Sequence, residues 1–228
     1  MALYAIGDLH LCLGAPKPMD VFGGAWVGYL DKLKEGLSVI QPEDTTVLLG
    51  DLSWALNLDD SREDFAWINK IPGRKIILKG NHDYWWSTAA KFYDFCDRNG
   101  FSNLNILNNN HFEYDGFAIC GTRGWFYEEE RSDTHDEKVF KRELIRLESS
   151  LKSAGDKPKK VFLHYPPLYK GYRCDEIIAL LKTYGVQECY YGHLHGPAHG
   201  LAMEGQWDGV FYRLVSADRL NFMPYRIF

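Results

Sequence analysis

Five short clusters of polar residues follow directly after apolar stretches of this chain, and glycine introduces most of them. Their side chains are of the types that bind metal ions: Asp8, His10, Asp51, Asn81, His164, His193 and His195. Short apolar runs are typical of strands that are covered on both faces. In open α/β sheets, ligands bind outside the carboxyl ends of the strands. We therefore expect the five clusters, although far apart in the sequence, to meet at one edge of the folded chain.

The apolar runs and the helical spacings between them predict alternating strands and helices in the first half of the chain. The predicted strands are residues 3–6, 46–49, 75–78, 117–120, 160–163, 188–191, 210–215 and 225–228. The predicted helices are residues 25–38, 61–69, 87–99, 134–153 and 174–184. The last roughly 40 residues show little helical pattern and predict a run of antiparallel strands. Because no repeat or low-complexity linker divides the chain, residues 1–228 are predicted to form a single domain.

The composition indicates a chain that can bury a substantial core, since 46% of its 228 residues are hydrophobic. The net charge of -5 argues against a nucleic-acid-binding surface, which would need a basic face. The five cysteines include no C-x-x-C pair, and we expect free thiols in a reducing compartment. The N-terminus lacks the basic region of a signal peptide, and no apolar stretch approaches the length of a membrane span. We therefore expect a cytoplasmic protein that does not enter membranes.

The polar side chains are more numerous than one metal ion needs. Residues i and i+2 of an extended segment point to the same side, so Asp8 and His10 can reach a common ion, and so can His193 and His195. Asp51 is a single carboxylate that can offer one oxygen to each of two ions. Two divalent cations carry more charge than two carboxylates offset, so the site would attract a phosphate. Two-metal sites of this kind hydrolyse phosphate esters.

In this order, the clusters resemble the calcineurin-like metallophosphoesterase family, whose pattern is D-x-H, G-D, G-N-H-[DE], a lone H and G-H-x-H. The chain carries these blocks as Asp8-Leu9-His10, Gly50-Asp51, Gly80-Asn81-His82-Asp83, His164 and Gly192-His193-Leu194-His195. They span most of the chain, with no departure at a ligand position. The resemblance implies a mixed α/β fold, a four-layer αββα sandwich of two mixed β-sheets flanked by helices.

The resemblance also implies which ion each ligand holds. The first ion would be bound by Asp8, His10, Asp51 and His195. The second would be bound by Asp51, Asn81, His164 and His193, so that Asp51 is shared. A hydroxide that bridges the two ions would attack phosphorus in line. Oxygen and nitrogen ligands without a thiolate suit Mn, Fe, Zn, Co or Ni.

Further residues are expected to act on the substrate. By the resemblance, His82 lies on the leaving-group side, where it donates a proton or stabilises developing charge, and Asp83 orients it. Asn81 is expected to contact the substrate as well as a metal. Arg123 follows a predicted strand, and it either binds a phosphate oxygen or pairs with the acidic run 128–130. The sequence leaves both roles of Arg123 open.

Aromatic side chains gather in the loops after the motifs, namely Trp26, Trp54, Trp85, Trp86, Trp125, Phe126, Tyr165, Tyr169 and Tyr172. Each one alone is better explained by packing at the edges of the sheets, but we expect at least one to touch the substrate. His111 and His135 are expected at the surface, and Cys12 is expected to be a small core residue. His199, four residues after His195, either supports the ligands from behind or is exposed to solvent, with a slight preference for the second.

These patterns predict a metal-dependent phosphoesterase for a small phosphomonoester or phosphodiester. Phosphoprotein hydrolysis stays open, whereas the lack of a basic stripe disfavours nucleic acid. The alternative is a non-catalytic scaffold that keeps the fold to bind partner proteins, although such a chain would be expected to lose ligands. A mononuclear hydrolase would need only three or four ligands and would leave the others unexplained.

Overall fold

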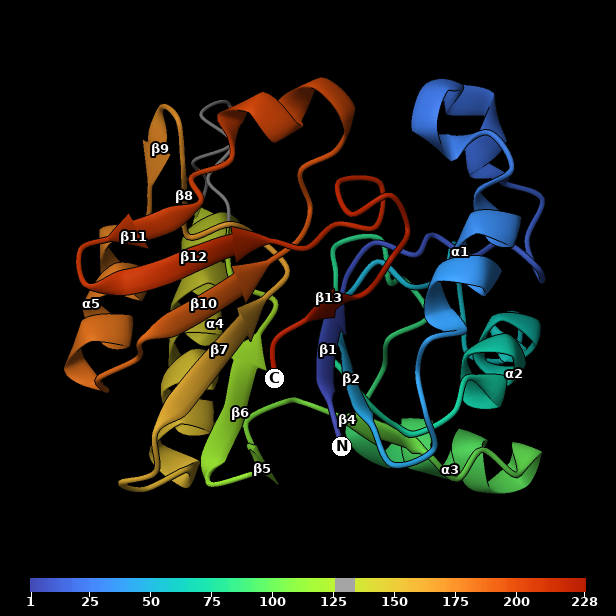
Figure 1. Ribbon diagram of the computed structural model, residues 1–228. Coiled ribbons are helices and arrows are strands. Elements are labelled where there is room, and N and C mark those ends of the chain that lie inside the picture. The colour runs from blue at the N-terminus through green and yellow to red at the C-terminus, as the bar shows by residue number, and fades with distance from the viewer. Residues whose placement is uncertain (126–133) are drawn as a thin grey trace.

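Two β-sheets form the centre of the molecule in a computed structural model that describes residues 1–125 and 134–228 (Figure 1). The first sheet has the strand order β13-β1-β2-β3-β4 and the second has the order β11-β12-β10-β7-β6-β5. The first sheet contains β1 (Leu3–Ile6), β2 (Thr45–Leu48), β3 (Arg74–Ile77), β4 (Leu104–Ile106) and β13 (Tyr225–Arg226). The second contains β5 (Phe112–Tyr114), β6 (Phe117–Thr122), β7 (Lys159–Leu163), β10 (Glu188–Tyr191), β11 (Gly205–Trp207) and β12 (Val210–Leu214). A separate hairpin pairs β8 (Leu168–Tyr169) with β9 (Tyr172–Arg173).

Both sheets are mixed. Strands β1 to β4 are parallel, and β13 joins this sheet antiparallel to β1. In the second sheet, β6, β7, β10 and β12 are parallel, while β5 and β11 are antiparallel edge strands. The carboxyl ends of the parallel strands in each sheet therefore lie on one edge.

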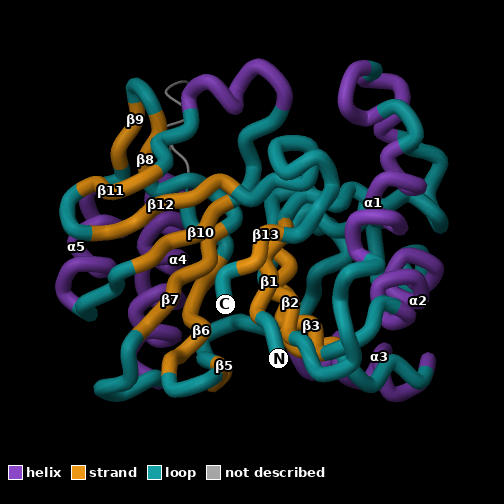
Figure 2. Tube along the Cα trace, viewed as in Figure 1, coloured by secondary structure: helices purple, strands orange, loops and turns teal. Residues whose placement is uncertain are grey.

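Helices cover the outer face of each sheet (Figure 2). The helices are α1 (Tyr29–Leu37), α2 (Arg62–Lys70), α3 (Ala89–Asn99), α4 (Thr134–Ser153) and α5 (Asp175–Thr183), with 3₁₀ turns η1 (Met19–Phe22), η2 (Gly24–Trp26) and η3 (Gly196–Leu201). Helices α1 to α3 lie on the side of the first sheet, and α4 and α5 lie on the side of the second (Figure 1). The predicted αββα sandwich is confirmed.

Alternation along each strand distributes side chains between two apolar layers. In β1, Leu3 and Ala5 pack with Phe162 in the layer between the sheets. Ile6 faces the other way and belongs to the cluster that contains Leu33 of α1. Because both faces of the strand are covered, its residues read as an apolar run without alternating polarity.

Most predicted elements appear within one or two residues of their predicted bounds. The predicted helix 25–38 is wrong at its start, because Val27 is extended and Gly28 has a φ of 64°, so that η2 ends before α1 begins. The predicted antiparallel run at the end of the chain is also only partly right. Strand β12 lies parallel to β10, and β13 crosses to the other sheet. The sequence analysis missed the short strands β4, β5, β8, β9 and β11.

No helix in residues 1–125 and 134–228 is long and apolar enough to cross a membrane. The assignment of residues 1–228 to a single domain stays a prediction.

Candidate metal centre

The loops that follow five parallel strands carry the seven candidate metal-binding side chains. Asp8 and His10 follow β1, Asp51 follows β2, Asn81 follows β3, His164 follows β7, and His193 and His195 follow β10. Backbone hydrogen bonds join these loops. The N–H of Asp8 donates to the carbonyl of Gly50 at 2.9 Å, and the N–H of Gly192 donates to the carbonyl of His164 at 3.0 Å. The N–H of Gly7 donates to the carbonyl of Val215 at 2.8 Å, which ties the two sheets together at this edge.

The backbone is strained at the candidate ligands. Asp8, His10, Asp51 and His193 have φ values of 61°, 46°, 49° and 74°, in the left-handed region that residues with a Cβ rarely adopt. Such conformations persist only where the surroundings over-determine them, and they cluster at functional sites. Here they turn the chain sharply after a strand, so that each side chain points into the space between the loops.

Two glycines permit the close approach of the loops. A Cβ on Gly80 would lie 2.1 Å from Oδ1 of Asp51, and a Cβ on Gly192 would lie 2.6 Å from Oδ2 of Asp8. Any larger residue at either position would displace a carboxylate. Steric contact with these carboxylates therefore explains why glycine stands at positions 80 and 192.

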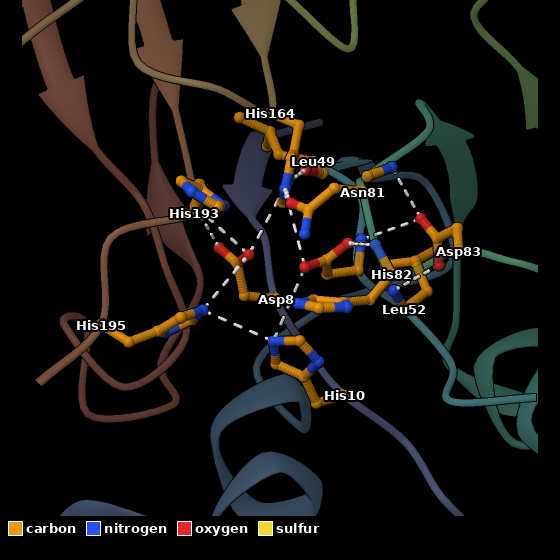
Figure 3. Close-up of polar contacts among 12 residues, drawn as sticks. Asp8, His10, Leu49, Leu52, Asn81, His82, Asp83, His164, His193 and His195 are labelled. Carbon is orange, nitrogen blue, oxygen red and sulfur yellow. Dashed lines mark hydrogen bonds and ion pairs between the residues drawn. The ribbon is translucent and has the colours of Figure 1, made fainter. Parts of the chain in front are cut away.

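The side chains converge as two groups. Asp8, His10 and His195 can bring one ligand atom each to within 4.8 Å of one another, and so can Asp51, His164 and His193. Figure 3 shows the imidazoles of His10, His164, His193 and His195 around the carboxylate of Asp8. Asn81 joins the second group, since its Oδ1 lies 2.6 Å from Nε2 of His164.

Asp51 belongs to the second group and also faces the first. Its Oδ2 is 3.9 Å from Nε2 of His10 in one group and 3.6 Å from Nε2 of His164 in the other. Its Oδ1 accepts the backbone N–H of His82 at 2.7 Å, which orients the carboxylate. Asp51 is therefore placed where a shared ligand would have to lie.

Hydrogen bonds from the protein orient other members of the groups. The carboxylate of Asp8 accepts the backbone N–H of His193, at 3.0 Å to Oδ2. Nδ1 of His164 lies 2.9 Å from the carbonyl oxygen of Leu49, to which it can donate a proton. That hydrogen bond would leave Nε2 of His164 free to bind a cation, as is usual for metal-bound histidines.

Burial strongly perturbs the proton affinities of these groups. Burial raises the pKa of Asp51 to about 7, although the charge of His164 opposes it. Burial alone would raise the pKa of Asp8, but the charges of His195, His164 and His10 outweigh it and lower that pKa. Burial and the charge of His164 lower the pKa of His193 to about 3. Shifts of this size in opposite directions are typical of a functional site.

The residues fit divalent cations. Nε2 of His10 faces Nε2 of His195 at 3.4 Å, although each imidazole nitrogen carries either one proton or one lone pair. Asp8 and Asp51 are almost completely buried beside these rings. A cation at each group would satisfy the lone pairs and the buried carboxylates together. Oxygen and nitrogen donors without a thiolate suit Mn, Fe, Zn, Co or Ni.

Asp83 makes contacts that differ from the predicted ones. Its carboxylate accepts backbone N–H groups from Asp51 at 2.8 Å, Leu52 at 2.8 Å and Gly80 at 2.7 Å, and the indole N–H of Trp85 at 2.8 Å. Among the described residues, no hydrogen bond joins the Asp83 carboxylate to the His82 ring (Figure 3). Asp83 instead ties the loop after β2 to the loop after β3, because a buried carboxylate needs N–H donors.

Asp218 is a site residue that the sequence analysis missed. Its Oδ1 lies 2.9 Å from Nδ1 of His195, and its Oδ2 accepts the N–H of Gly196 at 3.0 Å. His199 also lies at this carboxylate, with Nε2 3.2 Å from Oδ2, so its position favours a supporting role beside the ligands over simple solvent exposure. Burial lowers the pKa of His195, but the charges of Asp8 and Asp218 raise it to about 10.

A cavity of about 540 Å³ opens beside the candidate metal-binding groups. His82 lines it together with His10, His193 and His195. The indole of Trp54 stacks on His10 with 4.8 Å between ring centroids and lies 4.6 Å from the His82 ring. Burial, and then the charges of His164 and Lys17, lower the pKa of His82 to about 4. His82 is therefore a neutral imidazole at neutral pH.

Arg123 lies away from this cavity. Its guanidinium is 3.6 Å from Oε1 of the buried Glu143, and it lines a second cavity with Lys79 and Arg146. This position gives no support to binding of a phosphate oxygen by Arg123. The acidic run 128–130, its other expected partner, lies outside the described residues.

The remaining single residues have local contacts. Nδ1 of His111 lies 2.9 Å from Oγ of Ser153, and the thiol of Cys12 lies 3.2 Å from the hydroxyl of Tyr29. Cys12 is half-buried and packs against the core. Phe126 lies outside the described residues, and the side chain of His135 is not among those described.

Comparison with known protein families finds one family whose model matches this chain. The model of the calcineurin-like phosphoesterase family matches residues 1–197. No curated protein matches the chain.

Solved structures share the fold at low sequence identity. A phosphopantetheinyl hydrolase from Mycobacterium tuberculosis aligns with a TM-score of 0.58 at 16% identity, over 99% of this chain and 95% of that one. The protein of unknown function AQ665 from Aquifex aeolicus aligns with a TM-score of 0.55 at 18% identity, again over 99% and 95%. The protein TT1561 of Thermus thermophilus aligns with a TM-score of 0.50 at 14% identity, over 92% and 86%. At these identities the likeness shows the fold alone.

Proposed function

This chain belongs to the calcineurin-like phosphoesterase family, and from that premise we propose that it is a metal-dependent phosphoesterase for small phosphomonoesters or phosphodiesters. The observation that carries the proposal is the convergence of two groups of metal-binding side chains with Asp51 between them. One cation would be held by Asp8, His10 and His195, the other by Asn81, His164 and His193, and Asp51 would be shared. When bound, such cations activate water and neutralise phosphate charge.

Backbone groups and one carboxylate side chain hold these ligands in place before the substrate arrives. Leu49, Asp218 and the backbone N–H groups of His82 and His193 orient the ligands through hydrogen bonds. Pre-organisation of this kind lowers the cost of assembling the charged site at the moment of reaction.

His82 is the residue that we assign to the leaving group. Its ring lines the cavity beside the metal-binding residues, and Trp54 packs against it. Because burial keeps the imidazole neutral at pH 7, its N–H would donate a hydrogen bond to the departing oxygen. This contact would stabilise charge that develops there in the transition state.

A small substrate is supported by the size of the cavity and by the net charge of -5. One structural neighbour is named a phosphopantetheinyl hydrolase, and this name supports hydrolysis as the reaction class. The resident metals would come from Mn, Fe, Zn, Co and Ni.

The test is an assay of p-nitrophenyl phosphate and bis(p-nitrophenyl) phosphate with the Mn-loaded protein. We expect Asp51→Asn to abolish turnover and His82→Ala to reduce it by roughly 10²- to 10⁴-fold. Asp115→Asn and His111→Ala are matched controls, because neither residue lines the cavity, and they should keep full activity. Equal activity in all five preparations would contradict the proposal.

A further inference from the structure

The cavity beside the candidate metal-binding groups has two chemically different ends. Its polar lining consists of the candidate ligands and their partners: His10, Asp51, His82, His193, His195 and Asp218. Its other side chains are apolar: Met19, Phe22, Ala25, Trp26, Trp54 and Pro197. Among the described lining residues there is no lysine, arginine, serine, threonine, asparagine or glutamine. The ammonium of Lys17 lies over the Trp54 ring, 3.3 Å from its centroid, but Lys17 does not line the cavity. The polar end is therefore the place where a phosphate would bind, and the side chains of the other end offer mainly apolar contact.

The apolar wall is built directly against the metal-binding groups. The ring of Trp26 lies 5.8 Å from that of His10 and 5.6 Å from that of His195, in edge-on contacts. Trp54 stacks on the same His10. An ester whose phosphorus sat at the metal-binding groups would hold its organic group within reach of both indoles.

The turns η1 and η2 place part of this wall at the rim. Met19 and Trp26 are buried, whereas Phe22 lines the cavity and is 66% exposed. In Figure 1 these turns lie on the side of α1, and η3 lies across from them; all three contribute residues to the cavity lining, Pro197 from η3. An exposed phenyl ring in a cavity wall is a surface that a bound apolar group would remove from water.

Polar organic groups would fit this wall poorly. A sugar, a nucleobase edge or a second phosphate would lose most of its hydrogen bonds to water without replacement, because the only polar side-chain groups of this wall are the indole N–H groups of Trp26 and Trp54. We propose, in an inference that rests on the proposed function, that the substrate is a phosphoester whose organic group is apolar, of aryl or alkyl type. Phe22, Trp26 and Trp54 then determine specificity.

Binding of phosphonates tests this inference without requiring turnover. Methylphosphonate, phenylphosphonate and 4-carboxyphenylphosphonate share the same anionic head and differ in the group that would enter the wall. Titration calorimetry on the Mn-loaded protein should show phenylphosphonate binding at least roughly tenfold more tightly than methylphosphonate. The added carboxylate of the third compound should remove most of that gain.

Two exposed neighbours provide the matched variants. Phe22→Ala should reduce the ratio of phenyl to methyl affinity several-fold, because it removes the ring at the rim. Val21→Ala should leave the ratio unchanged, since Val21 is 75% exposed and does not line the cavity. Both side chains are largely exposed, so neither change removes core packing.

The outcomes separate the two proposals. Equal affinities for all three phosphonates, with ester hydrolysis intact, would overturn the apolar specificity and leave the phosphoesterase standing. An unchanged ratio in Phe22→Ala would likewise overturn it. Absence of both phosphonate binding and hydrolysis would overturn the proposed function and this inference with it.

Discussion

Nδ1 of His195 lies 2.9 Å from Oδ1 of Asp218, although the two residues are 23 positions apart. A hydrogen bond here holds the imidazole with Nε2 toward His10, at 3.4 Å, and toward Asp8, at 3.6 Å. Carboxylate partners of metal-bound histidines set the ring orientation and raise the basicity of the ligand nitrogen.

Removal of this partner should weaken the metal centre. We expect Asp218→Ala to lower the affinity for Mn²⁺ by about 10- to 100-fold, as measured by competition with a metal indicator. Asp208→Ala is the control, because Asp208 is a carboxylate outside the cavity that pairs with Arg173. Similar affinities in the two variants would show that Asp218 does not position His195.

Asp83 should matter for stability. Its carboxylate accepts four backbone N–H groups, that of Ser53 at 3.5 Å, and one indole N–H in a fully buried position. An amide at this position would turn an NH₂ group toward some of these donors. We expect Asp83→Asn to lower the free energy of unfolding by about 2–4 kcal/mol, because hydrogen bonds to a charged group are lost and donors are left unpaired.

Urea denaturation of the metal-free protein measures this loss. Asp115→Asn, in an exposed turn, should change the free energy of unfolding by less than about 0.5 kcal/mol. If Asp83→Asn were as stable as that control, the role given to Asp83 would be wrong.

The stability of the metal-free protein should depend on pH in the alkaline range. The folded pKa of His195 is about 10, against an ordinary value of 6.5. Because the folded state keeps this proton longer, the stabilisation is fully present below pH 6.5 and is lost as the pH rises toward 10. We expect the free energy of unfolding to fall over that window and to fall less steeply in Asp218→Ala. Parallel profiles for the two proteins would contradict the assignment.

Gly192 should tolerate no side chain. A Cβ there would lie 2.6 Å from Oδ2 of Asp8, whereas a Cβ on Gly200 would meet nothing within 4 Å. Displacement of a catalytic group by about 1 Å can cost about 10²-fold in rate. We therefore expect Gly192→Ala to reduce phosphoester turnover by about that factor and Gly200→Ala to leave it unchanged. Equal rates would mean that the Asp8 carboxylate adjusts freely.

The sequence predicted those parts of the site in which a residue of a metal-binding type directly follows an apolar run. The residue type indicates a ligand, and the position indicates the end of a strand. Asp8 and His10 follow β1, and His193 and His195 follow β10, so parallel strand ends explain why these pairs meet. Long apolar runs likewise predicted the central strands. The antiparallel edge strands β5 and β11 are only three residues long and leave little periodicity to detect.

The missed features depend on contacts that only the tertiary structure defines. Asp218 follows β12 with no motif around it, and the parallel placement of β12 beside β10 brings it to His195. Asp83 is adjacent to His82 in sequence, which suggested a pair, but its buried carboxylate is used by backbone N–H groups from another loop. Arg123 follows β6 near the same edge, yet Glu143 of α4 holds its guanidinium outside the cavity.

Anomalous scattering from crystals of the Mn-loaded protein would locate the metals directly. We expect two peaks about 3.5–4 Å apart, as in other two-metal sites. One should contact Asp8, His10 and His195, the other should contact Asn81, His164 and His193, and the Asp51 carboxylate should lie between them. A single peak in fully loaded crystals, or two peaks without Asp51 between them, would contradict a dinuclear phosphoesterase site.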